Sequence, residues 1–137
     1  MVENDSEKMD ENTINQVSSE ITDNDYFTSS RLERENMYSQ QLDSYQKIVD
    51  SSSIANDQKA IAQNEIKRIN DNKNAIMIIE NLVKTKGFED IIVFINGDSV
   101  NAVIKAEKLT AESIAQIQNI ITRELGTEIN NIHISNK

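Results

Sequence analysis

Cysteine and proline are absent from this 137-residue sequence, and glycine occurs only three times. Without cysteine the chain has no disulfide bonds and no thiolate metal site, but this does not fix the compartment, because many exported bacterial proteins also lack cysteine. Without proline, long helices can run uninterrupted. Gly87, Gly97 and Gly126 fall where helices or strands must break, because glycine enters left-handed backbone conformations most easily.

Basic residues and long apolar runs are also scarce. The 14 lysines and arginines stand against 23 aspartates and glutamates, which gives a formal net charge of −9 at pH 7. An acidic chain repels phosphate backbones, and this argues against nucleic-acid binding. No apolar run approaches the length needed to span a bilayer. Hydrophobic residues make up only 37% of the sequence, so we expect part of the chain to lie outside any core.

The first third of the sequence predicts a spacer and a helix. Residues 1–24 are polar and acidic, with too few apolar side chains to offset the entropy of ordering, and we expect a disordered acidic spacer. Asp25 can cap a helix that begins at Tyr26 and has one weak apolar stripe. This N-terminal helix unit, residues 25–53, ends at serines 51–53, because serine hydroxyls favour caps and turns over helix interiors.

A second helix is predicted from Ala55 to Lys86, and Gly87 ends it. Its stripe alternates spacings of four and three residues and consists of Ala62, Ile66, Ile69, Lys73, Ile76, Glu80 and Val83. The segment Ala75–Val83 is far more apolar than the first half of the helix. We therefore expect the C-terminal turns to cover a sheet and the N-terminal turns to project beyond it.

The most specific local signal is Asn-Gly at positions 96–97, between two apolar runs. This dipeptide is typical of a type I′ hairpin turn, in which both central residues need a positive φ angle. A two-residue turn there predicts that Val93 pairs with Val100. Ile91 would then pair with Ala102. Strand alternation places on the core face Ile91, Val93, Ile95, Val100, Ala102 and Ile104. It places on the opposite face Ile92, Phe94, Ser99, Asn101 and Val103.

The last third of the sequence predicts a third helix and a final strand. Thr110 can cap a helix that ends at Gly126. Ile132 and Ile134 then form a short strand. Residues 54–137 thus read as an α-β-β-α-β domain, with a right-handed crossover expected before a parallel last strand. The predicted fold class is α+β: N-terminal helices followed by a three-stranded sheet with helices on one face.

Residues that would carry enzyme chemistry are missing. His133, the only histidine, is out of phase with its apolar neighbours in the last strand, so we expect it on the surface. No nucleophile-elbow, phosphate-loop, zinc or dinucleotide motif occurs. Adjacent acids such as Glu89 and Asp90 flank strands, where carboxylates usually cap and remain solvated. We therefore expect no catalytic residue, no cofactor and no metal, and a protein that is not an enzyme.

The outer sheet face offers a candidate binding surface. Its apolar residues Ile92, Phe94 and Val103, together with His133, are the predicted partner-binding residues. An exposed strand edge could also accept a partner strand through main-chain hydrogen bonds. In the alternative interpretation, the long helices before Gly87 fold back and cover the apolar patch. The sequence leaves both interpretations open.

Three further segments are distinctive: Tyr26-Phe27-Thr28 at the start of a charged helix, the run from Leu82 to Asp90 before the sheet, and the run from Arg123 to Thr127 before the last strand. Together they resemble the stage III sporulation protein AH family of endospore-forming bacteria. Each segment is short, but the order and spacing of the segments agree with the family pattern from Tyr26 to the C terminus. The resemblance implies a fold similar to the ring-building motif of type III secretion and flagellar basal-body ring proteins.

The resemblance also implies a function and a location. Members of the family carry an N-terminal helix in the mother-cell membrane (the outer forespore membrane), and their soluble domain lies in the intermembrane space. That domain binds stage II sporulation protein Q and contributes to a channel and adhesion complex between mother cell and forespore, needed for engulfment and forespore development. The resemblance further implies a homo-oligomeric ring, other stage III sporulation complex proteins as partners, and no catalytic residues. The family's membrane helix is not found in this sequence, so we expect the sequence to represent the soluble portion of a family member.

Two other hypotheses follow from the residues alone. The helix-strand-strand-helix-strand order also occurs in KH-type nucleic-acid-binding domains, but these need a Gly-x-x-Gly loop and a basic groove, which this acidic sequence lacks. A purely helical adaptor would require the hairpin at positions 96–97 to be wrong. Salt-sensitive RNA binding would favour the first hypothesis, and a circular dichroism spectrum without strand signal the second.

Overall fold

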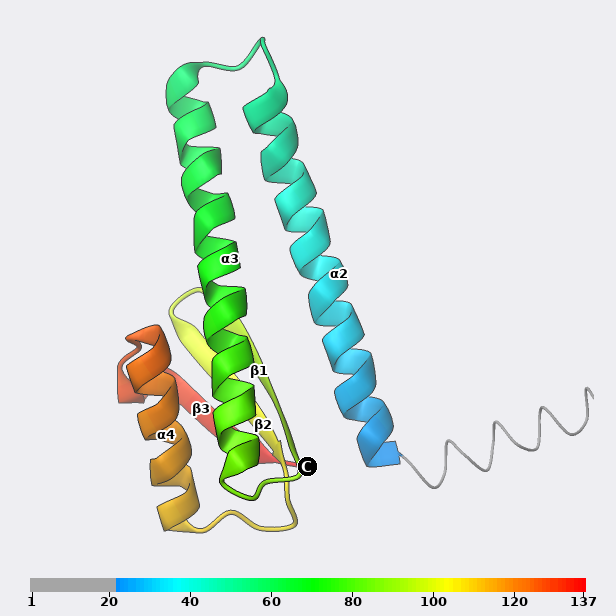
Figure 1. Ribbon diagram of the computed structural model, residues 1–137, viewed down its shortest axis with the longest axis vertical. Coiled ribbons are helices and arrows are strands. Elements are labelled where there is room, and N and C mark those ends of the chain that lie inside the picture. The colour runs from blue at the N-terminus through cyan, green and yellow to red at the C-terminus, as the bar shows by residue number, and fades with distance from the viewer. Residues whose placement is uncertain (1–21) are drawn as a thin grey trace, which may run out of the picture.

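The computed structural model describes residues 22–137, with side chains from Tyr26 onward (Figure 1). The elements in chain order are α2 (Thr22–Asp50), α3 (Asn56–Thr85), β1 (Asp90–Asn96), β2 (Ser99–Lys105), α4 (Ala111–Leu125), the short 3₁₀ helix η1 (Ile129–Asn131) and β3 (Ile132–Asn136). This order confirms the predicted α+β fold. Residues 1–21 of the predicted acidic spacer lie outside the described residues. Among the described helices, none is both long and apolar enough to cross a bilayer.

The start of the first predicted helix was wrong. α2 begins at Thr22, four residues before Tyr26, so Asp25 lies inside the helix and does not cap it. The segment from Thr22 to Asp25 contains neither glycine nor proline, and no residue in it forces the helix to start later. The other predicted helix boundaries agree with α3 and α4 to within one residue.

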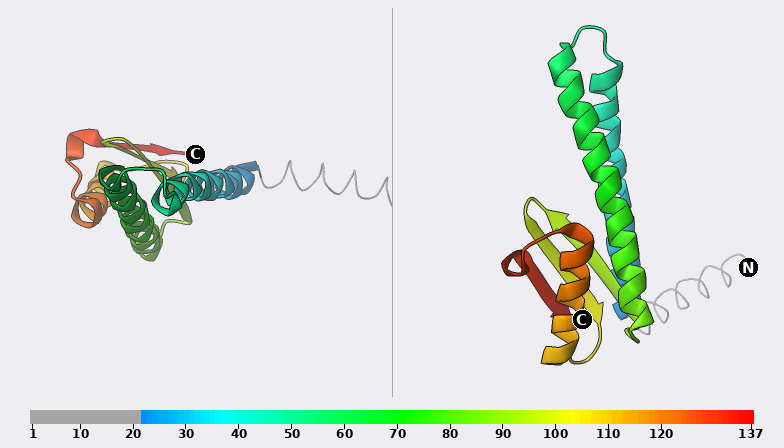
Figure 2. Two further views of the ribbon diagram at one scale, coloured as in Figure 1. Left: turned by 90° about the horizontal axis from the view of Figure 1, so that it is seen from above. Right: turned by 60° about the vertical axis from the view of Figure 1, so that its left-hand side comes forward.

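α2 and α3 form a long antiparallel hairpin that extends well beyond the sheet (Figures 1 and 2). The chain reverses direction at the predicted serine break, between Asp50 and Asn56. The first half of α3 packs on α2, with Ala62 and Ile69 buried, while its apolar C-terminal half lies over the sheet. This division of α3 confirms the prediction made from its apolar pattern.

The sheet has the strand order β1-β2-β3, with β1 antiparallel to β2 and β2 parallel to β3. The predicted hairpin register was wrong by two residues, because Val93 pairs with Ala102. The pair Asn96–Ser99 closes the turn, so its central residues are Gly97 and Asp98. Gly97 has φ +62° at the first central position, where a type II′ turn takes glycine. A shift of two residues keeps each side chain on its predicted face.

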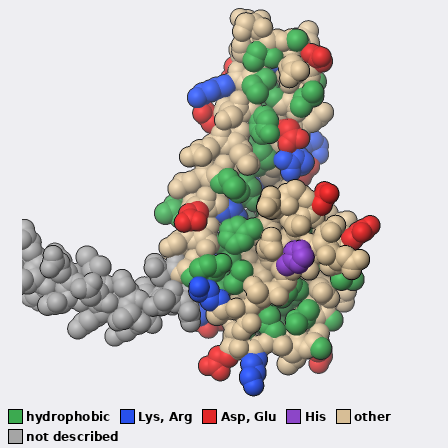
Figure 3. Space-filling model, turned by 180° about the vertical axis from the view of Figure 1, so that it is seen from behind, with side chains coloured by type: hydrophobic (Ala, Val, Ile, Leu, Met, Phe, Trp, Pro, Cys, Tyr) green, Lys and Arg blue, Asp and Glu red, His purple; other side chains and the backbone are tan. Residues whose placement is uncertain are grey.

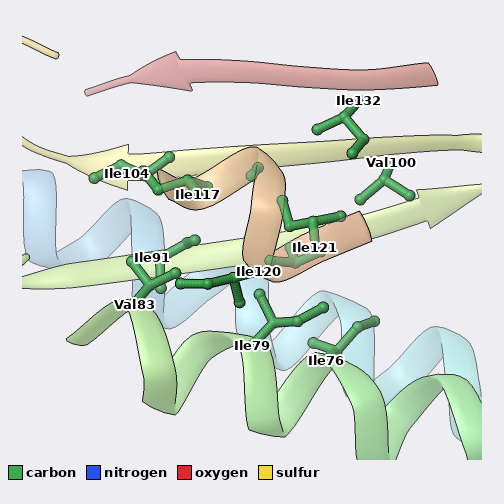
Figure 4. Packing of buried hydrophobic residues seen from close by; sticks show 12 residues of the cluster. Ile76, Ile79, Val83, Ile91, Val100, Ile104, Ile117, Ile120, Ile121 and Ile132 are labelled. Carbon is green, nitrogen blue, oxygen red and sulfur yellow. The ribbon is translucent and has the colours of Figure 1, made fainter. Parts of the chain in front are cut away.

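The main core lies between one face of the sheet and the two helices α3 and α4 (Figure 4). Twelve buried residues form it: Ile76, Ile79, Val83, Ile91, Val93, Val100, Ala102, Ile104, Ile117, Ile120, Ile121 and Ile132. Burying an isoleucine or valine side chain stabilises a fold by about 1.5–3 kcal/mol, so this cluster dominates the packing energy. None of its members comes from α2.

Local signals set the ends of α4 as predicted. The Thr110 hydroxyl accepts a hydrogen bond from the Ser113 N–H at 3.0 Å and caps the N terminus. Gly126 has φ +68°, and its N–H donates to the Thr122 carbonyl at 2.8 Å. These two caps define the ends of α4, which connects the neighbouring parallel strands β2 and β3.

Candidate functional site

The sheet register brings the four predicted partner-binding residues onto one face, in two rows across the strands. In the first row Phe94 lies opposite Asn101, which lies opposite His133. Phe94 and Asn101 are half-buried, and His133 is exposed. Figure 3 shows this face, with the histidine in purple and hydrophobic side chains in green near it. The first row is thus an apolar and polar surface accessible to a partner.

The second row consists of Ile92, Val103 and Ser135. Ile92 has no exposed surface, whereas Val103 is half-buried. Ile92 is covered within the chain and offers no exposed surface to a partner. Phe94, Val103 and His133 keep exposed surface.

α2 runs along β1 and accounts for this cover (Figure 2). Phe27 in its first turns is fully buried, and the Lys137 ammonium lies 4.3 Å from the centre of the Tyr26 ring. Because Lys137 follows β3, this contact places the beginning of α2 close to the far end of the sheet. α2 thus covers one end of the outer face, and the end near Phe94 keeps exposed surface.

A groove extends the open end of this face. It has a volume of about 470 Å³ and lies between the α2–α3 hairpin and the turn that joins β1 to β2. Phe94 and Ile95 line it on the sheet side, and Met37 lines it from α2. Met37 is 40% exposed, so this groove presents apolar surface to solvent. Such a surface is suited to hydrophobic contact with another molecule.

The outer edge of β1 is closed by a buried ion pair. Arg34 Nη1 on α2 donates to Glu80 Oε2 on α3 at 2.8 Å and to the Val93 carbonyl at 2.7 Å. The Val93 N–H donates to the same Glu80 oxygen at 3.0 Å. The two charged side chains are only 9% and 12% exposed. Both main-chain groups of Val93 that face away from β2 are therefore bonded to side chains instead of to another strand.

A second ion pair closes the same edge of β1 at Ile91, two residues before Val93. Arg31 contacts Asp90 and donates from Nη2 to the Ile91 carbonyl at 3.1 Å. The Ile91 N–H donates to Asp90 Oδ1 at 2.9 Å, and Lys84 Nζ lies 3.5 Å from the same oxygen. Burial alone would raise the pKa of Asp90, but hydrogen bonds from Arg31 and the Ile91 N–H and the charges of Arg31 and Lys84 outweigh it. The pKa of Asp90 is therefore lowered.

Sequence reasoning missed this arrangement. The pairs join residues far apart in the chain, such as Arg34 and Glu80, and helical spacing alone says nothing about which elements meet. One signal was present: Glu80 occupies a position of the apolar stripe of α3, where a carboxylate needs a buried partner.

The outer edge of β3 differs from that of β1. β2 is the one strand that pairs with β3 in the described part of the chain. No main-chain hydrogen bond from another element of residues 22–137 is made to the outer edge of β3. Asn136 Nδ2 donates to the carbonyls of Ala106 and Glu107 at 2.8 and 2.9 Å, and this holds the end of the strand in place. β3 thus presents main-chain donors and acceptors to a partner.

The geometry supports binding by apolar contact and main-chain hydrogen bonds. Over the described residues, no group of three or more histidine, aspartate and glutamate side chains could hold a metal ion. The strongly buried charged pair of Arg34 and Glu80 bonds the backbone of β1. These side chains have a structural role at the sheet edge.

Comparison with known proteins finds a curated relative and solved structures that resemble this chain. Stage III sporulation protein AH of Bacillus subtilis (strain 168) is 28% identical over 111 residues, which cover 81% of this chain. The chain spans about half (51%) of the length of that relative. A structure of the SpoIIQ–SpoIIIAH pore-forming complex contains a chain with a TM-score of 0.76 and 23% identity. The alignment covers 82% of this chain and 97% of that chain, and it shows a shared fold.

The type III secretion system protein EscJ of enteropathogenic E. coli aligns with a TM-score of 0.47 and 20% identity over 64% of this chain and 61% of EscJ. The family described as SpoIIIAH-like protein matches residues 1–134, which is nearly the whole sequence. The chain therefore belongs to the SpoIIIAH-like protein family.

Proposed function

We propose that this chain is a non-catalytic component of a sporulation complex and that it binds stage II sporulation protein Q. Family membership supports the sporulation role, and the related fold occurs in a structure of the SpoIIQ–SpoIIIAH pore-forming complex. The observation that carries the proposal is the outer sheet face, where Phe94, Val103 and His133 keep exposed surface beside the open edge of β3. A partner can bury the apolar groups and pair with the edge at the same time.

The proposed location follows from the same family. The domain would lie in the intermembrane space, attached to the mother-cell membrane through an N-terminal anchor. There it would join mother cell and forespore in a channel and adhesion complex needed for engulfment and forespore development, together with other stage III sporulation proteins. Its charge of −9 suits a protein partner better than a nucleic acid.

A homo-oligomeric ring is part of this proposal. A closed ring needs two different complementary surfaces on each subunit. A sheet continuous from subunit to subunit would need both β1 and β3 edges open, and Arg31 and Arg34 close the β1 edge. We therefore expect ring contacts to involve helices and sheet faces, such as the groove beside Phe94.

The test is a calorimetric titration of the chain with the soluble domain of stage II sporulation protein Q from the same organism. We expect saturable one-to-one binding, with a negative heat-capacity change because apolar surface is buried. The absence of heat and of co-elution at high micromolar concentration would reject this partner. Salt-sensitive binding of RNA in a parallel titration would instead support the nucleic-acid hypothesis.

A further inference from the structure

β1 has the composition of a self-pairing strand. Its seven residues, Asp-Ile-Ile-Val-Phe-Ile-Asn, include five consecutive apolar residues of high strand propensity and no charge between Asp90 and Asn96. Short segments of this kind, without proline or glycine, readily pair with copies of themselves. β1 is also an edge strand, and an edge strand of this composition needs protection.

The protection of β1 comes from side chains of the hairpin helices and from its own Asp90. The N–H and C=O of Ile91 are bonded by Asp90 and Arg31, and those of Val93 by Glu80 and Arg34. Every second residue of a strand directs its main-chain N–H and C=O to the same edge, so the main-chain groups of Ile95 also face this edge. A neighbouring strand can reach these groups only after both arginines leave.

α2 can leave without opening the main core. The core cluster between the sheet, α3 and α4 contains no residue of α2. Among the α2 side chains that the structure describes, only two apolar ones are buried, Phe27 and Tyr38. The attachment of α2 to β1 therefore depends on little apolar area and on the two ion pairs. Segments with few buried apolar contacts open locally at low free energy.

We propose that the outer edge of β1 is a masked strand-pairing surface, and that its partner, once α2 is released, is the same edge of a second copy of this chain. Antiparallel pairing centred on Val93 places Val93 opposite Val93 of the second copy and Ile91 opposite Ile95. No like charges meet along the five apolar residues. The contact is related by a twofold axis, so it closes at a dimer. This inference is independent of the binding to stage II sporulation protein Q.

The test compares two double variants of the full chain. Arg31→Ala/Arg34→Ala removes the two hydrogen bonds that α2 donates to this edge, at the Ile91 and Val93 carbonyls. Lys47→Ala/Lys67→Ala makes the same change in net charge but removes only exposed ion pairs within α2 and α3. Sedimentation equilibrium and amide hydrogen exchange are measured over a hundredfold range of concentration.

We expect the arginine variant to form additional dimers as its concentration rises, while the lysine variant sediments like the wild type. The amide of Ile95 should exchange fast at low concentration and slow at least tenfold at high concentration, whereas the amides of Ile91 and Val93 keep Asp90 and Glu80 as acceptors in the unpaired chain. A folded arginine variant that stays at the wild-type mass, with fast exchange at every concentration, would overturn the proposal.

Two further variants keep the test decisive. Arg31→Met/Arg34→Met removes the same two hydrogen bonds but keeps more of the side-chain volume, and if the alanine variant does not fold, self-association of this variant decides in the same way. Adding Phe94→Lys to whichever arginine variant is folded places a charge in the middle of the proposed strand pair and should abolish the dimer. A dimer that persists in that background would show that association occurs elsewhere, and would overturn the proposal.

Discussion

Removing the Glu80 carboxylate tests how strongly the contact between α2 and β1 stabilises the fold. Glu80→Ala leaves the guanidinium of Arg34, which is only 9% exposed, without its counter-charge. Breaking a buried pair in this way costs about 3–5 kcal/mol. The Val93 N–H also loses its acceptor, and this loss overlaps with the first. We expect the free energy of unfolding to fall by about 3–5 kcal/mol, a large part of the ~5–15 kcal/mol typical of a domain.

A second variant separates the ion pair from its bonds to the strand. Replacing both partners by apolar residues of similar size, as in Arg34→Met/Glu80→Leu, is often neutral or stabilising for a pair that bonds only itself. Here the replacement also leaves the N–H and C=O of Val93 without their partners. Each unsatisfied buried group costs about 1–3 kcal/mol, so we expect the double variant to be less stable than the wild type.

The assay is urea unfolding followed by far-ultraviolet circular dichroism, with the slope m compared between variants. Asp71→Ala is the matched control, because it removes an exposed carboxylate paired with Lys67 and should change stability by less than about 1 kcal/mol. An apolar double variant as stable as the wild type would refute the expectation that the lost bonds to Val93 outweigh any gain from the apolar replacement.

Three further predictions concern stability. The pKa of Asp90 is lower in the folded chain than the ordinary value of an unfolded aspartate, about 3.9. Ionised Asp90 therefore stabilises the fold above that ordinary pKa, and this stability is lost as pH falls through the lowered folded pKa. Asp90→Asn should flatten the acid side of the pH–stability curve below about pH 4. Gly126→Ala should cost about 1–2 kcal/mol from backbone strain alone, because φ is +68° and, apart from the adjacent residues, no atom lies within 4 Å of the added Cβ; a thermal melt measures this cost. Thr110→Ala should cost about 1 kcal/mol by urea unfolding, because the Ser113 N–H loses its acceptor, whereas Thr110→Ser should cost much less.

The elements of this fold are predictable because strong local signals mark their ends. Gly126 and Thr110 bound α4 as expected, and strand alternation assigns the sheet faces correctly. The hairpin register was less predictable, because Asn96 and Gly97 favour a type I′ turn while the neighbouring Gly97 and Asp98 allow a type II′ turn one residue later. The two turns place the same side chains on the same faces, so local chemistry alone does not choose between them.

The sequence could not predict which part of the outer face is covered, and the reason is different. The position of α2 depends on contacts between segments separated by tens of residues, such as Arg31 with the Ile91 carbonyl. α2 has only a weak apolar stripe, so its pattern does not indicate that it packs against β1 or that it buries Ile92. Phe94 and His133 were predicted on the outer face from alternation alone, and the register places both there.

The most direct test of partner binding is a titration of stage II sporulation protein Q with two matched variants of this chain. Phe94→Asp places a charge on the open outer face, and Ile61→Asp places the same charge on the exposed part of α3 that projects beyond the sheet. Burial of a phenylalanine contributes about 1.5–3 kcal/mol, so Phe94→Asp should weaken binding at least tenfold while Ile61→Asp leaves it unchanged. Cooperative melting of both variants is the control for folding. Equal affinities of two folded variants would contradict the assignment of the binding surface to the outer sheet face.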